Sequence, residues 1–259
     1  MAHVDYDTIG EKAGLRTLAI DIGGTGLKMM VLDASGVPVN ERDRERTPSP
    51  GTPRAILAVL ATQIDRQPQF DRISVGFPGV VIEGTVRTAP NLSPEWHEFP
   101  LAEALRKQTG QETRVANDAD VQGLGDIEGI GVELVLTLGT GFGSALFMAG
   151  TLVPNLELGH HPFRGDRTYE DYVGKPALED IGKKRWRKRL LKVLTQIQPI
   201  WNPRKIYLGG GNAKLVKPED LPENVKICPN AAGITGGIAL WRETGGPRDR
   251  GAHPAKHNP

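Results

Sequence analysis

Residues 18–32 read LAIDIGGTGLKMMVL, and the fold of this chain is best understood from them outward. Two apolar runs, 18–22 and 27–32, flank a turn that is rich in glycine. These runs predict two β-strands in a hairpin, and DASG at 33–36 predicts the turn that follows the second strand. Because no helix follows the glycines, the pattern differs from a Walker-type phosphate loop.

Predicted helices and strands alternate beyond this hairpin. The run 55–64 predicts a helix made of strong helix formers, and 101–110 predicts a helix that ends at a glycine cap. The run 72–81 predicts a strand that meets a break at Pro and Gly, and 114–120 predicts a short strand that ends in polar residues. Alternation of this kind is typical of an α/β sheet.

The opening pattern recurs in the second half of the chain. LVLTLGTGFGSALFM at 134–148 places apolar residues and glycines in largely the same positions as 18–32, which indicates two similar halves. The sequence then predicts a long helix near 176–201, a strand at 205–211 and a final helix at 230–241. We therefore predict two α/β domains, 18–117 and 118–241, between mobile tails at 1–17 and 242–259.

Composition excludes several classes of protein. The net charge of +1 creates no overall field that would favour nucleic acid or a membrane surface. The single cysteine, Cys228, excludes a disulfide scaffold within the chain and fits a reducing compartment. No apolar run reaches the roughly 18 residues of a membrane span. We expect a cytoplasmic protein that binds neither nucleic acid nor membrane, as a monomer or a homodimer.

The two glycine-rich turns carry groups suited to phosphate. Glycine closes tight turns without any ligand, so each turn alone has a purely steric interpretation. However, Asp21 ends an apolar strand, where a carboxylate is costly unless it is solvated, paired or near a cation. Thr25 and Lys28 add a hydroxyl and an ammonium group beside open amides. Two such turns facing each other across a cleft would hold a chain of phosphates, which favours a phosphoryl donor as ligand.

Three motifs carry a resemblance to a known superfamily. DIGGTGLK resembles the first phosphate motif of sugar kinases, heat-shock proteins and actin, LGTGFG resembles the second, and LGGG at 208–211 resembles the adenosine motif. More narrowly, the chain resembles the ROK family (repressor, open reading frame, kinase) from about Leu18 to Trp241. The resemblance implies an α/β, two-domain, actin-like (ribonuclease H-like) fold with a cleft between the domains.

A group of polar residues follows the strand that ends near 117. Asn117 and Asp118 lie where α/β sites usually open, and they are also favoured at a helix N-cap. The two interpretations are compatible. Phosphoryl transfer to an alcohol benefits from a base that orients the hydroxyl and accepts its proton. The resemblance implies that Asp118 is this catalytic base and that Asn117 holds a neighbouring sugar hydroxyl.

The run ELGHH at 157–161 supplies a carboxylate and an imidazole that suit vicinal hydroxyls, although an ordinary surface loop is the alternative. By resemblance, the sugar-binding residues are Gly79, Asn91, Asn117, Asp118, Glu157, His160 and Glu170. The family usually adds a zinc site made of that histidine and three cysteines. Residues 162–174 contain no cysteine, so we expect no zinc.

The run KKRWRKRLLK at 183–192 contains seven cations in ten residues. A solvated helix face would explain it, but like charges four residues apart repel, and a polyanion would relieve that repulsion. Polyphosphate fits better than nucleic acid because only 5% of the residues are aromatic. Together with the missing cysteines, this run resembles the polyphosphate-using glucokinases and glucomannokinases of the ROK family.

We therefore predict transfer of a phosphoryl group from inorganic polyphosphate or ATP to the 6-hydroxyl of glucose or mannose. The predicted donor-phosphate residues are Gly23, Gly24, Thr25, Lys28, Thr140 and Gly141, and the nucleotide residues are Gly209, Gly210 and Gly211. Lys184, Arg185, Arg187 and Lys188 are the predicted polyphosphate-binding residues. Asp21 would organise Mg²⁺ through water, whereas for Lys28 an ion pair on the strand face is an equal alternative to a phosphate contact.

Three alternatives remain at this point. A ROK repressor would need a DNA-binding unit before Leu18, and only 17 residues precede it, so we expect none. A sugar-binding ROK protein without turnover is disfavoured by the presence of both Asp21 and Asp118. An ATP-only kinase for another hexose, such as fructose or an N-acetylhexosamine, would be separated by a panel of substrates.

Overall fold

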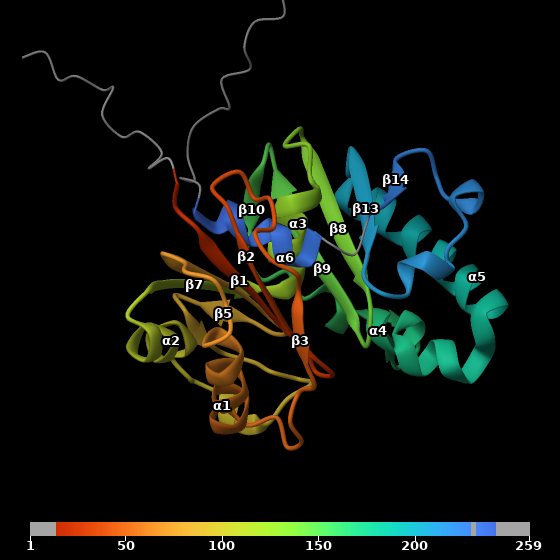
Figure 1. The fold of residues 1–259 in the computed structure, drawn as a ribbon. Coiled ribbons are helices and arrows are strands. Elements are labelled where there is room, and N and C mark those ends of the chain that lie inside the picture. The colour runs from red at the N-terminus through yellow and green to blue at the C-terminus, as the bar shows by residue number, and fades with distance from the viewer. Residues whose placement is uncertain (1–13, 229–231, 242–259) are drawn as a thin grey trace, which may run out of the picture.

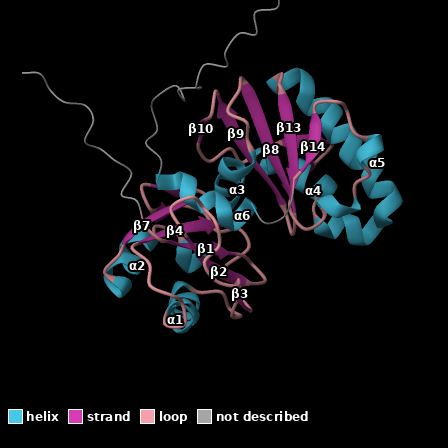
Figure 2. Ribbon diagram, turned by 45° about the horizontal axis from the view of Figure 1, so that its top comes forward, coloured by secondary structure: helices cyan, strands magenta, loops and turns pink. Residues whose placement is uncertain are grey.

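The structure is a computed structural model that describes residues 14–228 and 232–241. The predicted mobile tails lie outside the described residues except for 14–17, of which Thr17 already begins the first strand. Two five-stranded sheets lie side by side, each with its own helices (Figures 1 and 2). No helix among the described residues is long and apolar enough to cross a membrane.

The first sheet has the order β3-β2-β1-β4-β7. Its strands are β1 (Thr17–Ile22), β2 (Leu27–Leu32), β3 (Asp43–Glu45), β4 (Arg72–Phe77) and β7 (Glu112–Asn117). β1 and β2 form the predicted antiparallel hairpin, and β4 and β7 add in parallel. The helices α1 (Pro53–Ile64) and α2 (Leu101–Thr109) cover one face of this sheet. The alternate side chains of β1 on that face, Leu18, Ile20 and Ile22, are buried in the core beneath them.

The second sheet repeats this arrangement with the order β10-β9-β8-β13-β14. Its strands are β8 (Val132–Leu138), β9 (Phe142–Met148), β10 (Thr151–Val153), β13 (Lys205–Gly209) and β14 (Val225–Ile227). The second predicted hairpin is confirmed, because β8 and β9 pair antiparallel along their whole length. The helix α5 (Lys175–Trp201) lies on the outer side of this sheet (Figure 1), and its Trp186 and Leu190 are buried in the core of this half.

The predicted long helix near 176–201 is present, but it is broken at Gly182, which has φ 73° and ψ 161°. This left-handed backbone conformation is one that glycine adopts without a steric penalty. The basic run therefore starts a new helical segment directly after the break. Smaller elements connect the main ones: β5 (Val81–Ile82), β6 (Thr85–Val86), η1 (Pro94–Trp96), η2 (Leu158–His160), β11 (Pro162–Arg164), β12 (Arg167–Thr168), α4 (Tyr169–Val173), η3 (Ala213–Leu215) and η4 (Pro218–Asp220).

The helix α3 (Asp118–Asp126) lies between the two sheets (Figure 2). It starts directly after β7, so its first turn lies where the first sheet meets the second. Its Ala119 is part of a buried cluster with Val135 and Phe147 of the second sheet. A side-chain carbon built on Gly76 of the first sheet would lie 3.4 Å from the Cα of Asp118. This close packing fixes Asp118 between the two halves.

The prediction of one continuous final helix at 230–241 is wrong within the described residues. Only α6 (Ala232–Thr235) is α-helical, and η5 (Gly236–Trp241) is a 3₁₀ segment. Glycine is a poor helix former, and two glycines begin the 3₁₀ segment. Ile234 and Ile238 pack on the first sheet, although the predicted division at 117/118 assigns them to the second half. That division stays a prediction.

Candidate active site

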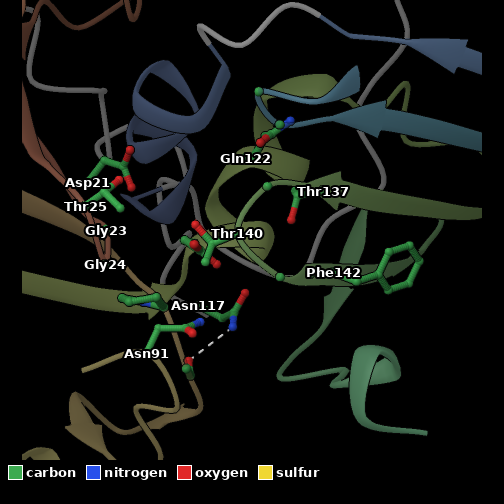
Figure 3. Close-up of a pocket in the computed structure, with 18 of the residues that line it drawn as sticks. Asp21, Gly23, Gly24, Thr25, Asn91, Asn117, Gln122, Thr137, Thr140 and Phe142 are labelled. Carbon is green, nitrogen blue, oxygen red and sulfur yellow. Dashed lines mark hydrogen bonds between the residues drawn. The ribbon is translucent and has the colours of Figure 1, made fainter. Parts of the chain in front are cut away.

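A cavity of about 600 Å³ lies between the two sheets and is lined by both glycine-rich turns. Figure 3 shows Asp21 and Thr25 on one side of it and Thr137 and Phe142 on the other, with Thr140 between them. Most of the predicted site residues line this cavity: Asp21, Gly23, Gly24, Thr25, Lys28, Gly79, Asn91, Asn117, Asp118, Thr140, Gly141, Glu157, His160, Glu170, Gly210 and Gly211. The fold thus brings together segments that are far apart in the sequence.

The first glycine-rich turn is closed by its own backbone. The amide of Gly23 donates to the carbonyl of Gly26 at 3.0 Å. Gly24 and Thr25 at the tip of the turn are exposed to the cavity. A side-chain carbon on Gly24 would lie 3.4 Å from the carbonyl oxygen of Asn91, so the loop that carries Asn91 reaches the tip of this turn.

The second turn is held from behind by two other segments. The amide of Lys175, at the start of α5, donates to the carbonyl of Thr140 at 3.1 Å. The side chain of Asn212 donates to the carbonyl of Gly139 at 3.0 Å. Both carbonyls are therefore hydrogen-bonded within the protein. Thr140, at the tip of the turn, is exposed and lines the cavity.

Asp118 is the half-buried first residue of α3. Burial, together with the nearby carboxylates of Asp21, Glu157 and Asp120, raises its pKa to about 7, although a hydrogen bond from the amide of Ala119 opposes the shift. A carboxylate with this pKa is a stronger base than an ordinary aspartate and is still ionised in a large fraction of molecules at neutral pH. The side chain therefore has the properties of a general base in this cavity.

Asp21 and Lys28 are cross-strand partners in the β1–β2 hairpin. The Nζ of Lys28 donates to Oδ2 of Asp21 at 2.7 Å, so the ion pair that the sequence allowed is formed. Both side chains also line the cavity. A phosphate contact by Lys28 stays a prediction.

Asn117 is the N-cap of α3, as the capping interpretation predicted. Its Oδ1 accepts from the amides of Ala119 at 2.8 Å and Asp120 at 3.4 Å. Its Nδ2 donates to the carbonyl of Gly79 at 3.1 Å and to Oε1 of Glu157 at 3.3 Å. The side chain of Asn117 therefore caps α3 and also forms part of the cavity wall.

The carboxylates expected at the sugar end of the cavity have further partners. Oε2 of Glu157 lies 3.5 Å from Nε2 of His160, and burial raises the pKa of Glu157. Oε2 of Glu170 accepts from the amide of Phe142 at 2.8 Å, where β9 leaves the second turn. Glu170, on α4, thus stabilises the end of the second turn. Its contact with a sugar stays a prediction.

An aromatic cluster occupies the loop in which the family usually has cysteines. The ring of Phe163 stacks on Tyr169 at 4.5 Å and meets Tyr172 edge-on at 5.0 Å. Tyr169 also stacks against Phe142 at 6.2 Å, next to the second turn. Residues 162–174 supply no thiolate for a structural zinc, and the aromatic contacts attach this largely exposed loop beside the second turn instead.

Five predicted site residues do not line the cavity. A side-chain carbon on Gly209 would lie 1.7 Å from Nε2 of Gln122, so a larger residue here would displace the Gln122 side chain, which itself lines the cavity. The other four lie on α5 and do not line the cavity: Lys184, Arg185, Arg187 and Lys188. They are exposed, except for Arg187, which is half-buried.

Sequence reasoning missed several residues that line the cavity: Arg42, Arg44, Gln122, Thr137 and Lys214. Two signals were available in the sequence. Residues 42–46 read RDRER, in which acids and bases alternate with the period of a strand, and Lys214 follows the glycine run by three residues. Gln122, by contrast, lies inside a helix without any such signal.

Comparisons with known proteins agree with this geometry. The chain is 32% identical over 244 residues to a polyphosphate glucokinase of Mycobacterium tuberculosis (strain H37Ra), covering 90% of this chain and 92% of the relative. The solved inorganic polyphosphate/ATP-glucomannokinase of Arthrobacter sp. strain KM has a TM-score of 0.79 and 32% identity, covering 89% of this chain and 100% of that one.

A ROK family glucokinase of Streptomyces griseus, solved with glucose and AMPPNP, has a TM-score of 0.74 at 19% identity, covering 87% of this chain and 98% of that one. These neighbours confirm the predicted two-domain, actin-like α/β fold. Residues 17–168 match the family description "ROK family". The chain belongs to the ROK family.

Proposed function

We propose that this chain is a sugar kinase that transfers a phosphoryl group from inorganic polyphosphate or ATP to the 6-hydroxyl of glucose, with mannose as a second acceptor. The observation that carries the proposal is that two glycine-rich turns and a carboxylate with a raised pKa line one cavity. The names of the relatives, polyphosphate glucokinase and polyphosphate/ATP-glucomannokinase, support this choice of donor and acceptor.

The donor phosphates would lie between the two turns. Thr25 and Thr140 at their tips, together with the neighbouring glycine amides, supply donors for phosphate oxygens. Phosphoryl transfer needs positioned dipoles more than covalent chemistry, because charge spreads over the equatorial oxygens in the transition state. The turns therefore orient the reacting phosphate, and the ATP adenosine would reach Gly210 and Gly211.

Asp118 would accept the proton of the attacking sugar hydroxyl. It starts α3 and lines the same cavity as the two turns and the Glu157–His160 pair, and the charges of Asp21 and Glu157 both act on it. Glu157 and His160 would bind neighbouring hydroxyls and hold the sugar with its 6-hydroxyl toward Asp118. Closure of the halves 18–117 and 118–241 on the sugar would exclude water and limit hydrolysis of the donor.

The residues of the cavity also fit a magnesium ion. Mg²⁺ prefers one or two carboxylates together with phosphate oxygens and water. Asp21 lines the cavity with one carboxylate oxygen bonded to Lys28, and it lies close enough to Asp118 to raise the pKa of that group. Asp21 would hold the ion through water, and the ion would neutralise charge on the donor phosphates.

The raised pKa of Asp118 leads to a prediction for the pH dependence. The base must be ionised, so kcat/KM for glucose at saturating donor should fall about tenfold per pH unit below a pKa near 7. Asp120, whose pKa burial also raises to about 7, provides the matched control, because its Oδ2 accepts from the amide of Asn155 and it does not line the cavity.

A pH–rate profile of the wild type and of Asp120→Asn would test this assignment. We expect an acidic limb in both proteins, shifted only slightly to lower pH in Asp120→Asn, because the carboxylate of Asp120 is the smallest of the causes that raise the pKa of Asp118. Loss of the limb in Asp120→Asn, or a limb near pH 4 in the wild type, would assign the titration to another group.

The basic face of α5 supports polyphosphate as donor and is testable separately. Neutralising Lys184, Arg185, Arg187 and Lys188 together should raise the KM for polyphosphate about tenfold or more, since each contact with a phosphate chain contributes through release of counterions. The KM for ATP should change by less than about twofold, because none of these residues lines the cavity. A coupled assay with Mg²⁺ and glucose would measure both donors, and equal losses or none would refute this donor-binding role.

A further inference from the structure

The short strand β3 sorts its charges onto two faces. In RDRER at 42–46, Asp43 and Glu45 both accept from the guanidinium of Arg66, at 2.9 Å and 3.0 Å. Arg42 and Arg44 line the cavity. Because successive side chains of a strand point to opposite faces, the acids of β3 are neutralised on one face and Arg44 lies on the other, while Arg42, directly before the strand, also lines the cavity.

Arg44 lies at the end of a row of charged residues that crosses the sheet. Asp21 pairs with Lys28 across β1 and β2, and Lys28 pairs with Arg44 across β2 and β3. Residues that are directly opposite on neighbouring strands share a face, so all three face the cavity that they line. The row runs from the carboxylate of Asp21 outward to the guanidinium of Arg44.

The guanidinium of Arg44 lies against the first glycine-rich turn. A side-chain carbon built on Gly26 would lie 3.4 Å from its Nε and 3.7 Å from its Nη2. Gly26 closes the turn by accepting from the amide of Gly23. Arg44 therefore extends the surface of this turn with a planar cation, a group that forms two-pronged hydrogen bonds with phosphate.

These arginines have no carboxylate to balance them. Within residues 14–228 and 232–241, Lys28 is paired with Asp21, but Arg42 and Arg44 take part in no ion pair within 4.0 Å. Both are exposed at the wall of a cavity that the proposed function fills with phosphates. A bound anion that carries further negative charge beyond the reacting phosphate would balance the charges of these two arginines.

We propose that Arg42 and Arg44 bind the part of an inorganic polyphosphate chain that extends past the phosphates held between the two turns. This inference rests on the proposed function. In ATP the α-phosphate, the third from the reacting end, is followed by an uncharged nucleoside, which would lie at Gly210 and Gly211, directly after β13 of the second sheet. A polyphosphate chain continues as further negatively charged phosphates. Arg42 and Arg44, at β3 and next to the first turn, are cations without an ion-pair partner that could bind these phosphates. The two arginines thus favour polyphosphate over ATP.

The test uses Arg42→Gln, Arg44→Gln and the double variant, with Arg46→Gln as the matched control on the same segment, because Arg46 does not line the cavity. KM values for long-chain polyphosphate, tripolyphosphate, ATP and glucose would be measured at several salt concentrations. Each single variant should raise the KM for long-chain polyphosphate about tenfold and the double variant about 100-fold, since hydrogen bonds to charged groups contribute at this level. The KM for tripolyphosphate, ATP and glucose should stay within about threefold.

The dependence of log KM on log salt for long-chain polyphosphate should also become shallower in the double variant, because fewer counterions are released. An unchanged KM for long-chain polyphosphate, an equal rise for ATP, or the same effect in Arg46→Gln would overturn the inference. Unchanged melting temperatures would show that the variants fold.

Failure of the proposed function would look different. In that case the wild type would form no sugar phosphate from any donor. Calorimetric titration of long-chain polyphosphate into the wild type and the double variant, without sugar, would still test the arginines. Binding that is equal in both proteins, or absent from the wild type, would overturn the role of Arg42 and Arg44.

Discussion

Replacing Asp118 with Asn is expected to lower kcat by about 10²–10⁴-fold, because the amide cannot accept the proton of the attacking hydroxyl. The KM values for sugar and donor should change by less than about threefold, since the substitution preserves the shape of the side chain. Steady-state kinetics with glucose and each donor would measure this. Asp120→Asn, which changes a buried carboxylate two residues away, should retain most of the activity. Equal losses in the two variants would remove the role of base from Asp118.

The same substitution should stabilise the protein at neutral and alkaline pH. The pKa of Asp118 is raised in the folded protein, so between about pH 4 and pH 7 the folded state binds more protons than the unfolded state. Its stability therefore falls as the pH rises through this range. Asn removes that penalty, and urea unfolding at pH 8 should show a gain of roughly 1–2 kcal/mol, allowing for partial solvation of the site. At pH 4 the gain should vanish, and a gain that is equal at both pH values would contradict the raised pKa.

Local patterns in the sequence were sufficient for the parts of the fold that are built from neighbouring residues. Both glycine-rich hairpins follow from apolar runs and turn residues, which act within about fifteen residues of each other. Asn117 was predicted as a cap because a cap needs only the following amides. The cavity could be anticipated because the two hairpins repeat one pattern, and the observed sheets repeat one strand order.

Contacts between distant segments could not be predicted from such patterns. The hydrogen bond that the amide of Phe142 donates to the carboxylate of Glu170 depends on how α4 packs beside β9. The place of Arg44 depends on the register of β3 against β2, and a shift of one residue would have turned it away from the cavity. The return of Ile234 and Ile238 to the first sheet joins segments about 200 residues apart, which no local periodicity encodes.

Glu133 illustrates a buried charge that no pattern in the sequence indicated. It lies on β8 inside an apolar strand and is fully buried, yet its carboxylate is saturated with donors. It accepts from the amides of Gly129 at 2.7 Å and Ile130 at 2.9 Å and from the hydroxyl of Tyr207 at 2.8 Å. Burial would raise its pKa, but these hydrogen bonds outweigh burial and lower it. The network ties the loop after α3 to β8 and β13, and so joins the helix of Asp118 to the strand that leads to the second turn.

Replacing Glu133 with Ala should lower the free energy of unfolding by about 3 kcal/mol, because it leaves several buried donors without an acceptor. Urea unfolding at pH 7 would measure the loss, and the exposed Glu128→Ala, which removes an ion pair with Arg204, should cost far less. Since the pKa of Glu133 is lowered on folding, its contribution is present above about pH 4.5 and is lost as the pH falls through the folded-state pKa. The stabilities of the wild type and Glu133→Ala should therefore converge at acidic pH. Equal losses in the Glu133 and Glu128 variants, or a difference that does not depend on pH, would show that the buried carboxylate does not hold this corner of the fold.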